Sequence, residues 1–170
     1  MRRLNVNDFS DRFLVRFMEE DDISTIYEMT RKNVQYYEFN GKENVIEDIA
    51  NDLIICPPGK NLNDKYYVGF FDGETLLAVI DLYDGYPDEK TAYIGFFMMN
   101  KEYQGKEIGT KIVSVLFEYL KSVGFERVRL GYERENPQSK HFWKKNQFQD
   151  ITEVSQDGII IVVAERNLKL

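Results

Sequence analysis

The chain has 170 residues, of which 43% are hydrophobic and one is cysteine, and its net charge is −7 at pH 7. These values predict one compact domain over residues 1–170 and exclude an internal disulfide, and the negative charge disfavours nucleic acid because phosphates would be repelled. No apolar run approaches the ~20 residues that cross a bilayer, and the basic N-terminus lacks the apolar stretch of a secretory signal. We therefore expect a cytoplasmic protein without a membrane or nucleic-acid partner.

The first half of the chain predicts two helices and a set of antiparallel strands. A cluster of acidic residues opens a helix whose apolar side chains begin at Ile23, since acids stabilise a helix N-terminus. A second helix is predicted over residues 44–53, where a Pro-Pro-Gly sequence follows. Asp72 and Gly73 form a hairpin turn. The predicted strands of this half cover residues 13–17, 66–71, 75–83 and 91–99.

The second half alternates between helices and strands. Helical spacing of apolar residues predicts a helix over residues 109–121, and period-two alternation predicts a strand over 127–132. Asn136 caps a further helix that begins at Pro137, and the apolar run 159–164 predicts a buried strand. This order of elements predicts an α/β fold with a mixed, mostly antiparallel central sheet and helices on both faces.

A short loop between a strand and a helix carries the clearest functional pattern. It contains Gly105 and Gly109 and exposes backbone N–H groups at the positive end of a helix dipole. This setting binds phosphate or pyrophosphate, although a plain strand-to-helix turn has the same residue types. The P-loop motif and the dinucleotide motif G-x-G-x-x-G are both absent from the sequence.

Two segments, QGKEIG at residues 104–109 and NPQSKHFWKKNQF at 136–148, together resemble two motifs of the GNAT superfamily of acyl-CoA-dependent N-acyltransferases. Residues 104–109, QGKEIG, resemble motif A, Q/R-x-x-G-x-G/A. Residues 136–148, NPQSKHFWKKNQF, resemble motif B, N-x-x-A-x-x-F-Y-x-K-x-G-F, and element order is similar over 13–148. The resemblance implies a GNAT-like fold and transfer of an acetyl group from acetyl-CoA, without a metal, to a primary amine of a small molecule or a peptide.

The resemblance also implies which residues hold acetyl-CoA. Backbone groups of Phe97, Met98 and Met99 would bind the pantetheine arm as an added strand. Asn136 would contact the same arm, although helix capping explains this residue equally well. The pyrophosphate would be held by backbone groups of Gln104, Gly105, Lys106, Glu107, Ile108, Gly109 and Thr110.

The sequence departs from the family motifs at functional positions. Glu107 occupies the first glycine position of motif A, where a carboxylate would repel a pyrophosphate unless it pointed away. Trp143 occupies the position of a tyrosine that often protonates the departing thiolate. Because an indole N–H cannot supply an acidic proton, we expect Trp143 to pack against pantetheine, and another group or water must be the acid.

The general base is predicted from the hairpin before motif A. The family often places a glutamate on this strand, but Tyr93 and Gly95 occupy the matching positions. If the loop at 84–90 closes symmetrically, Asp81 lies opposite Tyr93, on the face that also carries Gly95 and Phe97. Burial there would raise the pKa of the Asp81 carboxyl. We therefore expect Asp81 to be the base, with Tyr93 beside it.

Several alternatives stay open from the sequence. Asp81 could serve only as a structural hydrogen-bond acceptor, and Glu133 is a weaker candidate for the base. The aromatic residues Tyr36, Tyr37 and Phe39 fit either core packing or a wall of the acceptor site. The chain has one histidine and one cysteine, which excludes a metal site built from several histidine and cysteine ligands. A non-catalytic acyl-CoA-binding domain is the alternative function, and a homodimer is compatible with the sequence.

Overall fold

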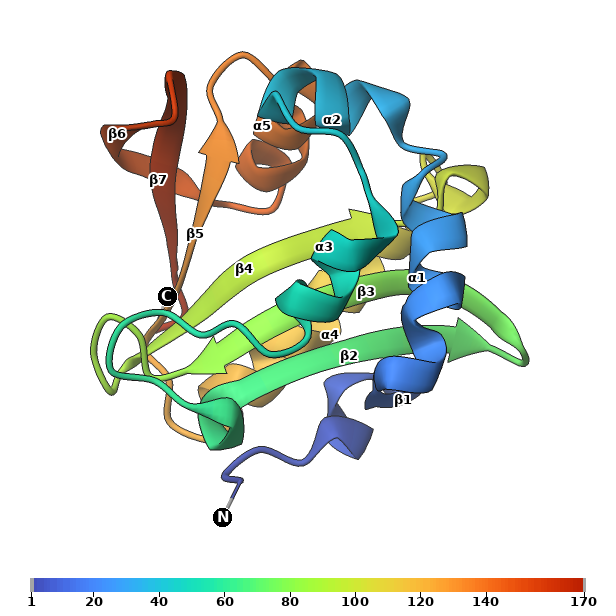
Figure 1. Cartoon of the computed structure of the whole chain (residues 1–170). Helices are drawn as coiled ribbons and strands as arrows, with labels where there is room; N and C mark the ends of the chain where they lie inside the picture. The colour runs from blue at the N-terminus through green and yellow to red at the C-terminus, as the bar shows by residue number, and fades with distance from the viewer. Residues whose placement is uncertain (1, 170) are drawn as a thin grey trace.

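One mixed sheet forms the centre of the computed structural model, which describes residues 2–169 (Figure 1). The strands are ordered β1-β2-β3-β4-β5-β7-β6. Their bounds are β1 Leu14–Phe17, β2 Lys65–Asp72, β3 Thr75–Asp84, β4 Thr91–Met99, β5 Arg127–Glu133, β6 Gln149–Gln156 and β7 Ile159–Asn167. The β4–β5 pair is parallel and the other neighbours are antiparallel, which confirms the predicted mixed, mostly antiparallel sheet.

Helices cover both faces of the sheet, as predicted. The α-helices are α1 Ile23–Thr30, α2 Val34–Asn40, α3 Ile46–Asp52, α4 Ile108–Ser122 and α5 Pro137–Lys145. Short 3-10 turns are η1 Val6–Phe9, η2 Glu20–Asp22, η3 Leu62–Asp64 and η4 Lys101–Tyr103. Figure 1 shows α1 and α3 in front of the strands and α4 behind them. Within residues 2–169, no helix combines the length and apolar content needed to cross a membrane.

Alternation along the strands produces one hydrophobic core on each face. On β3, Val79 packs in the core beneath α1 and α3, whereas the next residue, Ile80, packs in the larger core against α4. Both side chains are fully buried, because strands in the middle of the sheet are covered on both sides. This explains the continuous apolar run of β3 in the sequence.

One element, β7, differs from the prediction, and two others, α2 and β6, have no predicted bounds. Residues after α1 form a separate helix, α2, which ends where Gly41 adopts the left-handed conformation at φ 77°. The predicted buried strand is β7, but of residues 159–164 only Val162 and Ala164 are buried. Its partner β6 is exposed along its whole length, because it forms the edge of the sheet.

The register between β3 and β4 differs from the symmetric pairing expected from the sequence. Asp81 pairs with Phe96, and Tyr93 pairs with Tyr83, so the expected pairing of Asp81 with Tyr93 is wrong. The connecting loop is not symmetric, and a bulge next to Asp81 leaves Gly95 without a partner.

The bulge also changes which face each residue of β4 occupies. Phe97 packs in the core against α4, whereas Asp81 has the parity of Val79 and faces α1 and α3. The expectation that Asp81 and Phe97 share a face is therefore wrong.

The same bulge separates β4 from β5. Their parallel pairing covers Thr91 to Ile94 against Arg127 to Leu130 and ends there. Beyond Ile94, β4 bends away, and a gap opens between the carboxyl ends of the two strands. This gap lies where α2 and α5 meet the sheet and determines where the functional site forms (Figure 1).

Candidate active site

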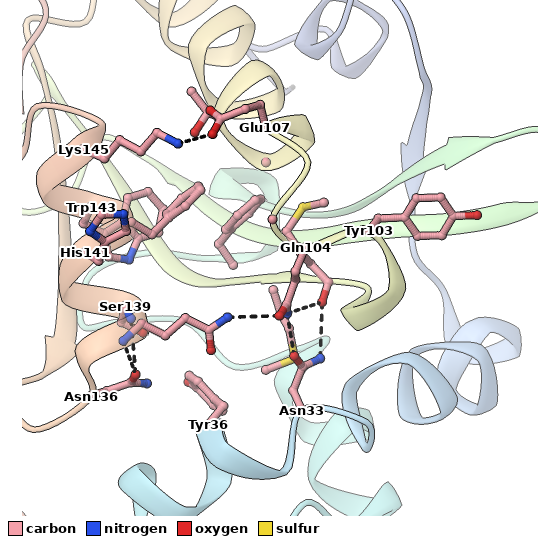
Figure 2. A pocket seen from close by; sticks show the side chains of 18 residues that line it. Asn33, Tyr36, Tyr103, Gln104, Glu107, Asn136, Ser139, His141, Trp143 and Lys145 are labelled. Carbon is pink, nitrogen blue, oxygen red and sulfur yellow. Dashed lines mark hydrogen bonds and ion pairs between the residues drawn. The ribbon is translucent and has the colours of Figure 1, made fainter.

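A cleft of about 370 Å³ opens between the end of β4, the following loop and α5 (Figure 2). It is lined by most residues that the sequence predicts to hold acetyl-CoA: Phe97, Met98, Met99, Gln104, Gly105, Glu107, Gly109, Thr110, Asn136 and Trp143. The side chains of Lys106 and Ile108 do not line it. Ile108 packs on the main core, and the Lys106 ammonium lies over the Tyr103 ring.

The N-terminus of α4 forms a cradle of backbone N–H groups beside the cleft. The first-turn N–H groups of a helix have no partner within the helix and carry the positive end of its dipole. Gly105 is open to solvent, since a Cβ added there would meet no atom within 4 Å. At Gly109 an added Cβ would lie 3.2 Å from Phe142 and 3.3 Å from Met99, so a side chain would push into the cleft wall. Gly105 therefore keeps the cradle accessible, and Gly109 lets α4 pack closely against Met99 and Phe142.

The backbone conformation and an ion pair explain how Glu107 occupies the glycine position of motif A. It caps α4 in the left-handed conformation, at φ 64°, which glycine adopts without strain. Its carboxylate accepts a hydrogen bond of 2.5 Å from the Lys145 ammonium on α5. The negative charge beside the cradle is thus paired, and Figure 2 shows this ion pair at the edge of the cleft.

A network of side-chain amides crosses the cleft at the end of β4. Gln104 donates to Asn33 Oδ1 at 2.7 Å, and Gln138 donates to Gln104 Oε1 at 3.0 Å (Figure 2). Asn33 and Gln104 both donate to the Met99 carbonyl at 3.3 Å. Two donors use both lone pairs of that carbonyl. The sequence did not single out Asn33 or Gln138, since an amide in a loop or on a helix has no distinctive local pattern.

Asn136 caps α5 as predicted. Its side chain accepts from the backbone N–H groups of Gln138 and Ser139, at 3.1 and 3.2 Å. The same side chain lines the cleft, so capping fixes its position there.

Trp143 lies in an aromatic cluster between the cleft and the core. Its ring meets Phe97, Phe142 and Phe148 edge-on, with centroid distances of 5.8, 4.8 and 5.2 Å. This arrangement agrees with packing and offers no acidic proton.

A second cavity, of about 40 Å³, occupies the gap between β4 and β5. It is lined by Glu133, whose residue surface is 9% exposed and which has no ion-pair partner among residues 2–169. Burial raises the pKa of the Glu133 carboxyl. A buried, unpaired carboxylate in a cavity can accept a proton or an ammonium ion.

Neither Asp81 nor Tyr93 lines either of the two cavities formed by residues 2–169. Asp81 instead forms a buried cluster, in which Lys65 Nζ donates to its two oxygens at 2.9 and 2.8 Å. The Tyr83 hydroxyl lies 2.8 Å from Asp81 Oδ2 and 3.0 Å from the Ile55 carbonyl. Burial raises the pKa of the Asp81 carboxyl, although Lys65 and Tyr83 oppose the shift. This cluster links the loop after α3 to the sheet.

Tyr36 of α2 is compatible with both predictions for the aromatic residues, which are core packing and a wall of the acceptor site. Its ring packs edge-on against Phe96 at 5.8 Å and against Tyr37 at 5.0 Å, which is core packing. Tyr36 also lines both cavities, whereas Tyr37 lines neither. No group of three or more His, Cys, Asp or Glu residues suited to a metal ion occurs in the described part of the chain.

Comparisons with known proteins agree with this geometry. The fold matches an acetyltransferase from Thermus thermophilus with a TM-score of 0.74 and 19% identity, over 91% of this chain and 96% of that one. It matches PaiA N-acetyltransferase from Thermoplasma acidophilum, in complex with coenzyme A, with a TM-score of 0.67 and 22% identity, over 91% and 98%.

A chimera of spermidine N-acetyltransferase from Vibrio cholerae matches with a TM-score of 0.64 and 15% identity, over 94% and 98%. No curated protein sequence matches the chain. The sequence profile of the Acetyltransferase (GNAT) family matches residues 23–148, which is more than half of the chain. The cleft, the cradle at α4 and the divergence of β4 from β5 therefore belong to an enzyme of the GNAT acetyltransferase family.

Proposed function

We propose that this enzyme transfers an acetyl group from acetyl-CoA directly to a primary amine, with Glu133 as the general base. The observation that supports this most is the meeting of two cavities at Phe97 and Trp143. The larger one has a phosphate cradle at one end, and the smaller one contains an unpaired carboxylate. A thioester at this junction would face the carboxylate from the opposite side to the phosphates.

The larger cleft is the proposed site of acetyl-CoA. The N–H groups at the start of α4 would hold the pyrophosphate, and the backbone at Phe97 and Met98 would pair with the pantetheine arm. Trp143 would pack against that arm. The similar PaiA N-acetyltransferase is in complex with coenzyme A, which supports this use of the fold.

Glu133 replaces Asp81 in our proposal for the base. A primary amine is protonated at neutral pH and must lose a proton before it attacks the thioester. Glu133 lies in the cavity and forms no ion pair with a cation of residues 2–169, whereas Asp81 is paired with Lys65 outside both cavities. The raised pKa of Glu133 makes it a better proton acceptor than an exposed glutamate.

The acceptor is proposed to be the amine of a small molecule or of a peptide. An unpaired carboxylate attracts an ammonium group, and the net charge of −7 favours approach of cations. Spermidine is named as the substrate of one structural neighbour, which supports a cationic small molecule as the first class to assay.

The test is release of CoA with a panel of primary amines that includes a polyamine and peptides with a free N-terminus. We expect Glu133→Gln to lower kcat by about 10²–10⁴-fold, since this is what a positioned base contributes. The matched control is Glu135→Gln, which removes an exposed carboxylate two residues away that pairs with Arg134. Equal rates in the parent and Glu133→Gln would refute the base, and no turnover by the parent on any amine would refute the function.

A further inference from the structure

The proposed transfer leaves one chemical requirement without a residue. When the C–S bond breaks, the electron pair goes to sulfur, and the CoA thiolate needs a proton. Motif B of the family carries a tyrosine at the position of Trp143, whose indole cannot serve as an acid. Another proton donor is therefore required at the junction of the two cavities.

Four residues line both cavities: Tyr36, Phe97, Ser139 and Trp143. Among these, only Tyr36 and Ser139 carry an O–H group. An aliphatic hydroxyl is a far weaker acid than a phenol, so Tyr36 is the stronger donor of the two. Tyr36 projects from α2 at the lower side of the cleft in Figure 2, between Asn33 and Asn136.

The other acidic side chains of the site lie away from this junction. Tyr103 and His141 line only the cofactor cleft. Tyr132 lines only the smaller cavity, and its hydroxyl donates to Asp150 Oδ1 at 2.9 Å. That hydrogen bond directs the Tyr132 proton away from the cavity. Tyr36 is thus the phenol that reaches both substrates' cavities.

Packing holds the Tyr36 ring in one orientation. Phe96 on β4 and the neighbouring Tyr37 meet it edge-on, with interplanar angles of 73° and 83°. Burial, and then the negative charge of Glu133, raise the pKa of the Tyr36 hydroxyl. A hydrogen bond with the Asn40 side chain lowers this pKa, and the charge of Asp52 raises it further. The phenol is therefore protonated at neutral pH.

We propose that Tyr36 donates the proton that the departing CoA sulfur requires, a role that rests on the proposed acetyl transfer. Glu133 takes the first proton from the ammonium, and the amine nitrogen forms a bond to the acetyl carbon. The C–S bond breaks, sulfur takes the Tyr36 proton, and the phenolate regains a proton from the attacking nitrogen. The products are the amide, which keeps one N–H, and CoA thiol, with one proton left on Glu133.

The raised pKa of Tyr36 is compatible with this step. Desolvation that disfavours a phenolate also disfavours a thiolate in the same cavity. The proton therefore moves between two acids whose pKa values are raised by the same cause. A hydrogen bond from the phenol to sulfur also stabilises the negative charge that develops as the bond breaks.

The first test compares kcat of Tyr36→Phe with that of Tyr37→Phe under saturating acetyl-CoA. The Phe variant keeps the ring and its edge-on contacts, so only the hydroxyl is lost. We expect kcat to fall about 10²-fold in Tyr36→Phe and to stay near the parent in Tyr37→Phe, with acetyl-CoA affinity unchanged in both. Tyr37 is the matched control because it touches Tyr36 but lines neither cavity.

The second test needs no turnover. The thiolate of bound CoA absorbs in the ultraviolet, so its pKa can be titrated in the complex. If the Tyr36 hydroxyl bonds to sulfur, Tyr36→Phe should raise that pKa by about one to two units relative to Tyr37→Phe. An unchanged thiol pKa together with parent-like kcat in Tyr36→Phe would overturn the role of Tyr36 and leave the acetyl transfer standing. Absence of turnover by the parent enzyme on every amine of the panel would instead overturn the proposed function.

Discussion

Replacing Asp81 with Asn should destabilise the enzyme far more than it slows the chemical step. The side chains of Lys65 and Asp81 are only 2% and 8% exposed, and Lys65 Nζ contacts both carboxylate oxygens. Asparagine has the same shape but no charge, so the Lys65 ammonium would stay buried without a counter-ion. Removing one partner of such a pair costs about 3–5 kcal/mol.

That cost corresponds to a large change in thermal stability. For a chain of this size, 1 kcal/mol lowers Tm by about 2–4 °C, so Asp81→Asn should lower Tm by about 6–20 °C. Calorimetry and urea unfolding measure this change. The control is Glu102→Gln, which breaks the exposed pair with Lys32 and should leave Tm close to that of the parent.

A double replacement separates charge from position. Lys65→Met with Asp81→Leu removes both charges, and such apolar replacements of buried pairs are often neutral or stabilising. The Tyr83 hydroxyl would keep its hydrogen bond to the Ile55 carbonyl. We expect the double variant to regain most of the lost stability.

Activity decides between a structural and a catalytic Asp81. The folded fraction of Asp81→Asn should retain kcat within a few-fold of the parent. Parent-like stability combined with a loss of about 100-fold or more in kcat would refute this reasoning and would identify Asp81 as the base.

Four further outcomes follow from the site. Gly109→Asp should abolish the stabilisation by acetyl-CoA, which is about 2.7 kcal/mol at 100 times Kd, as a thermal-shift titration would show. Glu107→Gly should tighten acetyl-CoA binding about two- to fivefold in calorimetric titration. The change removes a negative charge near the cradle, relieves the backbone strain of the positive φ at residue 107 and frees the Lys145 ammonium. Trp143→Phe should keep kcat within a few-fold in steady-state assays, because it retains an aromatic ring. The kcat/KM profile should fall as pH decreases through a pKa above that of an ordinary glutamate, because burial raises the pKa of Glu133 and protonation removes the base. In Glu133→Gln this limb should be replaced by one at the pKa of the acceptor amine, since only the neutral amine then reacts.

Much of the fold could be predicted from local patterns. The period of apolar residues located α4, and the sequence Asn136-Pro137 located the start of α5, since capping involves atoms only a few residues apart. The bounds predicted for the strand at 91–99 are those of β4. The cradle at Gly105 and Gly109 was also recognisable, because it depends on one loop and the helix that follows it.

The catalytic side of the site depended on contacts between distant parts of the chain. The bulge at Gly95 changed the register of Asp81, and no local sequence pattern predicts a single unpaired residue in a strand. Lys65 lies 16 residues from Asp81, so their ion pair exists only once β2 and β3 are aligned.

Glu133 and Tyr36 obtained their positions in the same way. A glutamate at the end of a strand is usually exposed, whereas Glu133 is only 9% exposed and lines the gap between β4 and β5 together with Tyr36 of α2. Tyr36 is near a carboxylate 97 positions later in the sequence. Sequence alone therefore determined four of the five α-helices in residues 2–169, most strands and the glycine-containing loop before α4, which depend on neighbouring residues. Tertiary structure decided which carboxylate and which phenol line the gap between β4 and β5, because burial and register depend on all strands of the sheet together.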